Sequence, residues 1–309
     1  MADLDLGPVV LGGNVFGWTA DRDESFAVLD AFVDGGGRAI DTADVYSAWL
    51  PGNAGGESES ILGEWFASRG RRDDVVLMTK IGAWEARRGL AAATVTAAVD
   101  DSLRRLRTDR VDVLLAHRDD PTVPQEETMS ALDALVRDGK VRALGASNFS
   151  AERLRSAAAV ADAAGLTPFT VAQDLWSLVE RGIETALVPT LDELGIAETP
   201  YSSLASGFLS GKYAPGRSVD SARSKKAGAY LEDPRAVAAL DAARDVAEQQ
   251  GVPVSAVALA WLRAQRTVAA PTASARTVDQ VPDLLAAGRV RLTPQHLELL
   301  SAATEPVGG

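Results

Sequence analysis

The sequence predicts an α/β protein of the (β/α)₈ TIM-barrel type, with residues 1–309 forming one domain. Short apolar runs rich in β-branched residues alternate with longer stretches whose apolar residues recur every three or four positions. That alternation is typical of parallel strands covered by helices. Eight such units fit into the chain, as a barrel of this type requires, and no linker-like segment divides it. A doubly wound open sheet is the structural alternative.

The expected strands are short and rich in Val, Ile, Leu and Thr, as strands buried on both faces should be. In chain order they are residues 9–13, 38–43, 75–81, 111–117, 141–147, 170–176, 198–204 and 267–273. The stretches between them are amphipathic, and residues 24–36 show the helical spacing well. The glycines at 35–37 follow that stretch without a strand before them. We therefore expect a helix-ending turn there, and no nucleotide-binding fingerprint.

The composition narrows the class of partner. The net charge is −12, and no basic stripe indicates nucleic-acid binding. The chain has no cysteine, which excludes disulfides and thiolate metal sites, and its two histidines, His117 and His296, are too few for a histidine-rich metal site. The first residues are acidic, and no apolar run reaches membrane length. We expect a cytoplasmic protein that binds a small molecule and no metal, nucleic acid or membrane, with the oligomeric state undetermined.

Polar residues close three successive predicted strands. Asp41, Lys80 and His117 end the second, third and fourth strands, 39 and 37 residues apart, and Tyr46 follows in the loop after Asp41. Each alone has an ordinary interpretation, as a turn former, a solvated strand end or a structural histidine. In a barrel, however, the carboxyl ends of the strands meet at one rim, where active sites are built. The shared register therefore predicts one site that contains all four side chains.

These residue types suit the reduction of a carbonyl group by hydride transfer, which needs a proton for the developing alkoxide. A free tyrosine has a pKa near 10 and holds its proton at neutral pH. A lysine ammonium about 4 Å away favours the phenolate by roughly 4 kcal/mol at an effective dielectric of about 20, and desolvation opposes that shift. We expect Asp41 to hold Lys80 charged and directed at Tyr46, the proton donor. His117 is expected to hydrogen-bond the substrate oxygen.

Three segments carry a resemblance to a known family: DTADVY at 41–46, TK at 79–80 and LLAH at 114–117. The chain resembles the aldo-keto reductases over nearly its whole length, from LGGNVFGW to RTVDQV. It is most similar to a bacterial branch of general-stress and sugar-related reductases, which is also similar to the potassium-channel β-subunits. The resemblance implies a tetrad of catalytic residues, with an aldehyde or ketone, such as a sugar, as substrate. The tetrad is Asp41, Tyr46, Lys80 and His117.

The resemblance also implies a nicotinamide cofactor, NADPH, with NADH as the alternative. GASNFS, YSSLASGFLSGKY and PTASARTVDQ match the family's cofactor-binding elements. In them, Tyr201 would stack on the nicotinamide and Arg276 would meet the 2′-phosphate. Trp18 and Trp84 are the implied substrate-wall residues, with packing at the rim as the alternative for Trp84. The implied cofactor contacts are Asn14, Val15, Ser147, Asn148, Gln173, Tyr201, Ser202, Leu204, Ala205, Lys212, Ser274, Arg276 and Gln280.

Residues 205–230 form a long Gly- and Ser-rich stretch that interrupts the regular series. Long loops in compact domains are often functional lids, and the resemblance implies that this one covers the cofactor. Its Lys212 would contact the phosphates, whereas Lys225 and Lys226 are expected to be solvated. The basic residues of the stretch are Lys212, Arg217, Arg223, Lys225 and Lys226.

Four positions depart from the family pattern. Ser274 stands where Gly or Lys is common. Asp283 and Leu284 stand where Glu-Asn is common, which removes an expected adenine contact, and Trp176 stands where Tyr is frequent. Trp176 is expected to pack beneath the site or to shape the substrate pocket.

Two other function classes use the same residues. One is a nucleotide-binding regulatory subunit, similar to the channel β-subunits, that binds cofactor with little turnover. The other is a barrel aldolase or lyase with Lys80 as Schiff base. For that chemistry Asp41 is unfavourable, because it stabilises the protonated amine.

Overall fold

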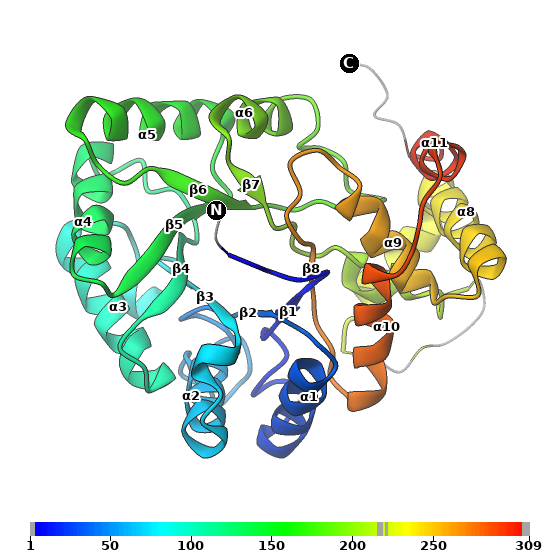
Figure 1. Ribbon diagram of the computed structural model, residues 1–309, viewed down its shortest axis with the longest axis horizontal. Helices are drawn as coiled ribbons and strands as arrows, with labels where there is room; N and C mark the ends of the chain where they lie inside the picture. Colours follow the sequence, from blue (N-terminus) through cyan, green and yellow to red (C-terminus); the bar gives the residue numbers. More distant parts are fainter. Residues whose placement is uncertain (1–3, 215–218, 220–221, 305–309) are drawn as a thin grey trace.

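The computed structural model describes residues 4–214, 219 and 222–304, and these form a barrel of parallel strands surrounded by helices (Figure 1). Within the described residues the sheet has eight strands in the order β7-β6-β5-β4-β3-β2-β1-β8. The sequential order excludes the doubly wound alternative, and the (β/α)₈ prediction is confirmed. The strands are β1 Val10–Gly12, β2 Ala39–Asp41, β3 Val76–Ile81, β4 Val111–Ala116, β5 Val141–Ser147, β6 Phe169–Gln173, β7 Ala197–Glu198 and β8 Thr272–Ala273.

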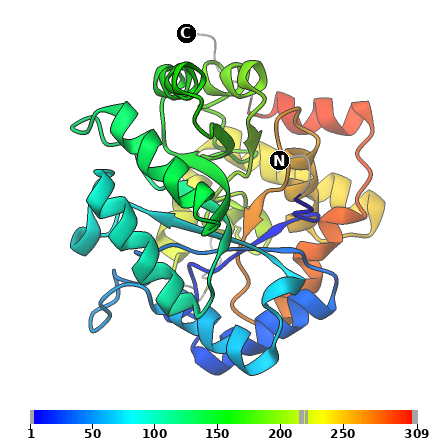
Figure 2. The ribbon, with the colours of Figure 1, turned by 60° about the vertical axis from the view of Figure 1, so that its left-hand side comes forward.

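Helices follow the strands and lie on the outside of the barrel, as two ribbon views show (Figures 1 and 2). The first helix begins with a capping box between Asp21 and Glu24 and ends at Gly35, so the turn predicted at 35–37 is confirmed. The α-helices are α1 Arg22–Asp34, α2 Glu57–Arg69, α3 Ala92–Leu106, α4 Gln125–Arg137, α5 Ala151–Ala164, α6 Leu187–Leu194, α7 Ser224–Gly228, α8 Pro234–Gln250, α9 Val254–Arg263, α10 Val281–Leu285 and α11 Pro294–Ala302. The 3-10 helices are η1 Arg72–Asp74, η2 Glu85–Arg87, η3 Ala205–Ser210, η4 Ala229–Glu232, η5 Val278–Gln280 and η6 Ala286–Gly288.

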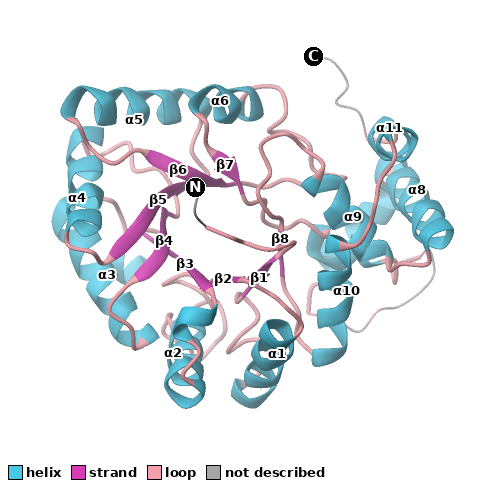
Figure 3. Ribbon diagram, in the orientation of Figure 1, coloured by secondary structure: helices cyan, strands magenta, loops and turns pink. Residues whose placement is uncertain are grey.

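The barrel closes between β7 and the segment before β8 through a few backbone contacts instead of a long ladder. The Glu198 N–H donates to the Thr267 carbonyl at 2.8 Å. The seven-residue strands expected in both places are too long, because β7 and β8 have two residues each (Figure 3). Pro200 and Pro271 explain the difference, since proline has no N–H to donate to a ladder.

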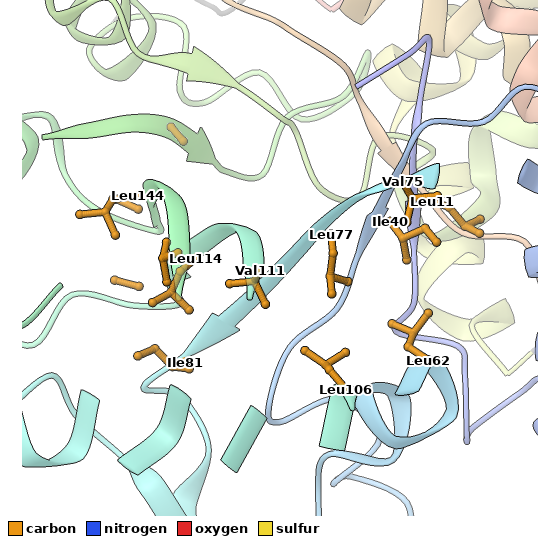
Figure 4. Packing of buried hydrophobic residues seen from close by; sticks show 14 of the residues in the cluster. Leu11, Ile40, Leu62, Val75, Leu77, Ile81, Leu106, Val111, Leu114 and Leu144 are labelled. Atoms are coloured by element: carbon orange, nitrogen blue, oxygen red, sulfur yellow. The ribbon is translucent and has the colours of Figure 1, made fainter. Parts of the chain in front are cut away.

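Successive strand residues point alternately into the barrel and toward the helices. Outside, Ile40 of β2 and Leu77 of β3 face Leu62 of α2 and Leu106 of α3, and all four are fully buried (Figure 4). Inside, one apolar cluster fills the lower part of the barrel: Leu6, Val10, Ala39, Met78, Val113, Leu115, Val171 and Ala270. The alternation decides which strand-end residues reach the interior above this cluster.

Helices α2 and α3 are in close backbone contact at Gly63. A methyl group at this position would lie 2.0 Å from the Arg105 carbonyl oxygen, far inside van der Waals contact. The absence of a side chain therefore sets the spacing of the two helices. This spacing matters for the site, because α2 carries Glu59 and α3 carries Arg105.

The stretch 205–230 is partly helical, which corrects the expectation of one long loop. It contains η3 and α7 and the start of η4. Phe208 is fully buried against α8 and α9, so η3 is anchored to the core. Lys225 and Lys226 are exposed as expected, and Arg217 lies outside the described residues.

Trp176 belongs to the same apolar cluster. It is 1% exposed, its ring meets Trp261 edge-on at 6.4 Å between centroids, and its indole N–H donates to Glu184 at 2.9 Å. Of the two expectations for this residue, the structure supports packing beneath the site. Across residues 4–304, as far as they are described, no helix is long and apolar enough to cross a membrane, and no group of three acidic or histidine side chains could hold a metal ion.

Candidate active site

Three strands deliver polar side chains to the upper part of the barrel interior. Asp41, Lys80 and Gln173 each stand two positions after an inward-facing apolar residue of their own strand, so they continue its inward column. Asp41 and Lys80 are each 1% exposed. Charged groups this deeply buried are tolerated only when they are paired and hydrogen-bonded.

Asp41, Lys80 and Tyr46 form one hydrogen-bonded group. The Lys80 ammonium donates to both Asp41 oxygens at 2.7 Å and to the Tyr46 hydroxyl oxygen at 2.8 Å. It also donates to the Thr42 carbonyl at 2.7 Å. The Tyr46 hydroxyl donates to Asp41 at 3.1 Å, and the Gln173 amide donates to the other Asp41 oxygen at 3.0 Å. The structure thus brings together the acid, the amine and the phenol that the sequence places on one rim.

Burial governs the proton affinities of Tyr46 and Lys80. It raises the pKa of the Tyr46 phenol well above 10, and the neighbouring Asp41 carboxylate raises it further. Burial lowers the pKa of Lys80, which the Asp41 charge opposes. The expected shift of the Tyr46 phenol toward its ionised form is not found, because burial and the Asp41 carboxylate raise its pKa. Tyr46 holds its proton at neutral pH.

His117 follows β4 directly and lines the same cavity as Tyr46. The two ring centroids are 6.2 Å apart, with an interplanar angle of 81°. Burial, with smaller contributions from the charges of Lys80 and Arg118, lowers the pKa of the imidazole to about 3, so the ring is neutral. Nδ1 is buried and has no partner among the described residues. A neutral ring with its proton on Nε2 leaves no orphaned donor and offers an N–H to the cavity.

A second cluster of buried charges lies behind the tetrad. Glu59 is fully buried and accepts from the Thr79 hydroxyl at 2.6 Å and from the Arg105 guanidinium at 2.7 Å. Asp44 is fully buried as well, but neither of its oxygens has a well-formed hydrogen bond within the described structure. Burial, and then the Glu59 charge, raise the pKa of Asp44 to about 7, although Arg105 opposes the shift. Asp41 is paired with Lys80 and Glu59 with Arg105, whereas Asp44 forms no ion pair with a described residue.

A cavity of about 610 Å³ opens at the carboxyl ends of the strands. All four tetrad side chains line it. Of the predicted cofactor contacts, Ala205 alone does not line the cavity, because it is buried beneath its own loop. The others lie on the wall: Asn14, Val15, Ser147, Asn148, Gln173, Tyr201, Ser202, Leu204, Lys212, Ser274, Arg276 and Gln280.

The loops after β4, β5 and β7 are tied together at Asn148. Its backbone N–H donates to Asp174 at 2.9 Å, and its side-chain amide donates to the His117 carbonyl at 3.1 Å. The Tyr201 hydroxyl donates to the Asn148 amide oxygen at 2.9 Å. Asn148 has a φ of 59°, a left-handed conformation that needs support from its surroundings. These bonds supply it and fix Tyr201 relative to His117.

Asp174 and Glu198 form a buried pair of carboxyl groups beneath Asn148. The Asp174 N–H donates to one Glu198 oxygen at 2.8 Å, and the other oxygen has no partner among the described residues. Burial raises the pKa of Asp174 to about 7. Burial and the Asp174 charge raise the pKa of Glu198 well above its usual value. Because two adjacent buried carboxyl groups cannot both ionise cheaply, the pair holds a proton at neutral pH.

The far end of the cavity lies at the loops after β7 and β8. The backbone takes positive φ values of 55° at Ser202, 47° at Ala205 and 59° at Ser206, and such strained turns concentrate at binding sites. Lys212 and Arg276 line this end. Burial, together with the nearby Arg276 charge, lowers the pKa of Lys212. Neither cation forms an ion pair with a described residue, so this end of the cavity suits an anion.

The two tryptophans predicted at the substrate wall do not line the cavity. Trp18 lies one layer back, where its ring meets Trp49 edge-on at 5.5 Å between centroids, and Trp49 itself lines the cavity and is 48% exposed. The Trp84 indole N–H donates to the Ala54 carbonyl at 3.0 Å, and the Arg105 guanidinium covers its ring at 5.2 Å. Trp84 therefore packs at the rim, which is the alternative the sequence left open.

Sequence reasoning did not assign Trp49, Arg118 or Arg223 to the site, although all three line the cavity. Arg118 follows His117 directly, so its place in the chain was a usable signal. Trp49 stands in the turn after Tyr46, whose direction the sequence does not reveal. Arg223 immediately precedes α7, and its guanidinium lies 5.1 Å from the centre of the Trp18 ring. Its position could be known only after α7 was placed.

Comparisons with known proteins cover nearly the whole chain. The model of the aldo/keto reductase family matches residues 8–305. The chain is 32% identical to YrpG, an uncharacterized oxidoreductase of Bacillus subtilis, across 99% of this chain and 94% of that protein. It is 30% identical to the putative aryl-alcohol dehydrogenase AAD14 of Saccharomyces cerevisiae, across 97% of this chain and 84% of that protein. It is 33% identical to norsolorinic acid reductase B of Aspergillus parasiticus, across 98% of this chain and 82% of that protein.

Proposed function

Since the chain belongs to the aldo/keto reductase family, we propose that it reduces an aldehyde or ketone with a hydride from NADPH and a proton from Tyr46. The observation that carries the proposal is the contact of the buried Lys80 ammonium with both Asp41 and the Tyr46 hydroxyl at the cavity wall. The relatives named as oxidoreductase, dehydrogenase and reductase support the reaction class. The reverse reaction oxidises the corresponding alcohol.

The cavity residues fit a nicotinamide dinucleotide. Lys212 and Arg276 at one end are cations of the kind that phosphate groups need. Asn148 and Gln173 line the other end with amide groups, and Tyr201 lines it with an aromatic ring. When bound, the reduced nicotinamide supplies the hydride. The rest of the reaction is binding, orientation and proton transfer by side chains of this chain.

Tyr46 protonates the oxygen that becomes negative as the carbonyl is reduced. Its raised pKa means that the phenol enters the reaction with its proton. Lys80, at 2.8 Å, stabilises the phenolate that remains, and Asp41 holds the ammonium in place. The neutral His117 donates from Nε2 to the same carbonyl oxygen and orients it. Two fixed donors aimed at one oxygen stabilise the charge that develops there.

The preference for NADPH over NADH rests on Arg276. Its backbone N–H donates to the Gln280 side chain at 2.9 Å, which fixes the turn that carries the guanidinium. Asp283 lines the same cavity, and its carboxyl group opposes a 2′-phosphate when ionised.

The substrate end of the cavity supports an aromatic or other flat carbonyl compound. Trp49 lines it with a half-exposed ring, and the ring of Tyr46 lies 6.2 Å from that of Trp49. Relatives of the chain are named for aryl alcohols and for norsolorinic acid. The Schiff-base alternative is disfavoured, because the Lys80 nitrogen is surrounded by oxygens of Asp41, Thr42 and Tyr46 and is buried.

The test is Tyr46→Phe, which removes only the hydroxyl. We expect the turnover of an aldehyde panel to fall by about 10³-fold, while the Kd for NADPH, measured by tryptophan fluorescence, stays within about twofold. Tyr230→Phe is the matched control, because its hydroxyl bonds Glu180 outside the cavity. Equal turnover in Tyr46→Phe and wild type would refute the assignment of the proton donor. Tight NADPH binding with no turnover by wild type over a broad panel would favour the regulatory subunit.

A further inference from the structure

We propose that Asp174 is a positioning residue for the nicotinamide end of the cavity. Its ionised carboxylate holds the backbone turn at Asn148, and Asn148 holds Tyr201, so the cofactor binds more weakly once Asp174 takes up a proton. The inference rests on the proposed reductase function, because it concerns the cofactor of that same site. Asp174 is not among the described residues that line the cavity, and it therefore acts through Asn148.

A chain of hydrogen bonds leads from β7 to the cavity wall. Glu198 of β7 accepts the Asp174 N–H at 2.8 Å, and the Asp174 carboxylate accepts the Asn148 N–H at 2.9 Å. The Tyr201 N–H donates to the Asp174 carbonyl oxygen at 2.9 Å. Asp174 is thus bonded to two of the residues that line the nicotinamide end, one through its side chain and one through its backbone.

The side chain of Asn148 is committed to its neighbours. Its amide donates to the His117 carbonyl at 3.1 Å and to the Ser147 hydroxyl at 2.9 Å, and its oxygen accepts from the Tyr201 hydroxyl at 2.9 Å. The left-handed backbone at Asn148, with a φ of 59°, needs a separate support, which the Asp174 carboxylate gives. The placement of Tyr201 therefore depends on Asp174.

Of the two buried carboxyl groups, Asp174 is the one suited to carry a charge. Glu198 is fully buried, and one of its oxygens has no partner among the described residues, so a charge there would lack solvation. Asp174 is 5% exposed and accepts an N–H, which favours its charged form. Burial raises the pKa of Asp174 to about 7, so its charge changes within the neutral range.

The surrounding groups do not replace Asp174 in this role. Tyr201 and His117 keep their charge state near neutral pH, because burial raises the pKa of the phenol and lowers that of the imidazole to about 3. Residues 267–273, which bond the Glu198 backbone, carry no ionisable side chain. The charged groups that act on Tyr201 come from β7 and from the loops after β4 and β6: Glu198, Arg118, Asp174 and Glu180. Of the groups that bond Asn148, Asp174 is therefore the one whose charge changes near pH 7.

The first experiment follows the Asn148 backbone amide by NMR, without cofactor, in protein that contains isotope-labelled asparagine. The chain has three asparagines, Asn14, Asn53 and Asn148, and the signal that disappears in Asn148→Asp identifies Asn148. In wild type we expect this signal to shift with pH, with a midpoint near 7. Glu198→Gln should keep the shift, because glutamine resembles the protonated Glu198, whereas Asp174→Asn should abolish it. No shift in wild type, or a shift that is lost in Glu198→Gln and kept in Asp174→Asn, overturns the proposal.

The second experiment measures the Kd for NADPH by tryptophan fluorescence at about pH 6 and about pH 8. Asp174→Asn keeps an acceptor oxygen but no charge, so it resembles the protonated wild type. Because the cofactor prefers the ionised form, the wild-type affinity is complete above the pKa and falls as the pH drops through it. The Kd of Asp174→Asn should therefore equal that of wild type at about pH 6 and exceed it by about fivefold at about pH 8.

The ratio of the two Kd values cancels other titrations, such as those of the 2′-phosphate and of Asp44, which both proteins share. Asp162→Asn, which changes an exposed acid of α5, is the control and should match wild type at both pH values. A ratio for Asp174→Asn that does not change with pH overturns the proposal and leaves the reductase function intact. If wild type does not bind NADPH, the proposed function fails, and the amide titration still decides whether Asp174 holds Asn148.

Discussion

Asp44→Asn should gain stability relative to wild type as the pH rises from 5 to 8. Asp44 is fully buried, lacks a well-formed hydrogen bond in the described structure and has a pKa raised from 3.8 to about 7 by burial and by Glu59. The two nearby cations, Lys80 and Arg105, are paired with Asp41 and Glu59. Ionised Asp44 is thus a buried charge without a counter-ion, and asparagine removes the ionisation with little change of shape.

The magnitude follows from the raised pKa. In the folded protein the carboxyl group keeps its proton up to pH about 7, whereas in the unfolded chain it ionises near 3.8. Its contribution to stability is therefore complete below the unfolded pKa and is lost as the pH rises through the folded one. About three pKa units correspond to a total loss of about 4 kcal/mol, of which roughly 2.5 kcal/mol falls between pH 5 and pH 8. Asp44→Asn does not suffer this loss.

The assay is urea unfolding of wild type and Asp44→Asn at several pH values from 5 to 8. The difference in the free energy of unfolding, variant minus wild type, should grow by roughly 2.5 kcal/mol across this range. Asp245→Asn is the control, because Asp245 is exposed and forms no ion pair with a described residue. Its difference from wild type should not change with pH. If the Asp44→Asn difference were also constant, Asp44 would be ionised and paired in the folded protein. The description of ionised Asp44 as a buried charge without a counter-ion would then be wrong.

Two further predictions concern the cofactor end and the helices. Arg276→Met should weaken the binding of NADPH by about tenfold and that of NADH by less than about threefold, because only NADPH carries the 2′-phosphate that the guanidinium would bind. Equal weakening of both cofactors in fluorescence titrations would contradict that role. Gly63→Ala should destabilise the protein by about 1–3 kcal/mol, since the new methyl would lie 2.0 Å from the Arg105 carbonyl and force α2 away from α3. Gly182→Ala, which meets no atom within 4 Å, is its control in thermal unfolding, and equal melting temperatures would show that the helices yield freely.

The fold and the tetrad could be predicted because both depend on the strict alternation of strand residues. Once Ala39 and Met78 face inward, Asp41 and Lys80 must do so too, two positions further along. The inward placement of Asp41 and Lys80 therefore needed no knowledge of loops, whereas Tyr46 lies in the loop after β2 and His117 follows the end of β4. The proton affinity of Tyr46 was predicted less well, because desolvation depends on how completely the surrounding chain excludes water.

What could not be predicted depends on loop direction or on pairs distant in sequence. Trp84 and Trp49 both follow a strand closely, yet only Trp49 lines the cavity. The pairing of Asp174 with Glu198 requires β6 and β7 to be neighbours in a known register. Arg223 belongs to a stretch whose composition indicated an irregular loop, and its direction is set by the helix that begins beside it.

Strands β7 and β8 have two residues each, so fewer ladder hydrogen bonds hold this side of the barrel than hold the side with the longer strands. The proposed proton-transfer residues lie at or just after the ends of β2, β3 and β4, and β3 and β4 have six residues each, whereas the proposed phosphate-binding loops follow β7 and β8. We therefore expect local opening to cost less free energy at β7 and β8 than at β3, which carries Lys80. Under the proposed function, a dinucleotide would enter and leave at the side of β7 and β8, while the hydrogen bonds among Asp41, Lys80 and Tyr46 stay in place.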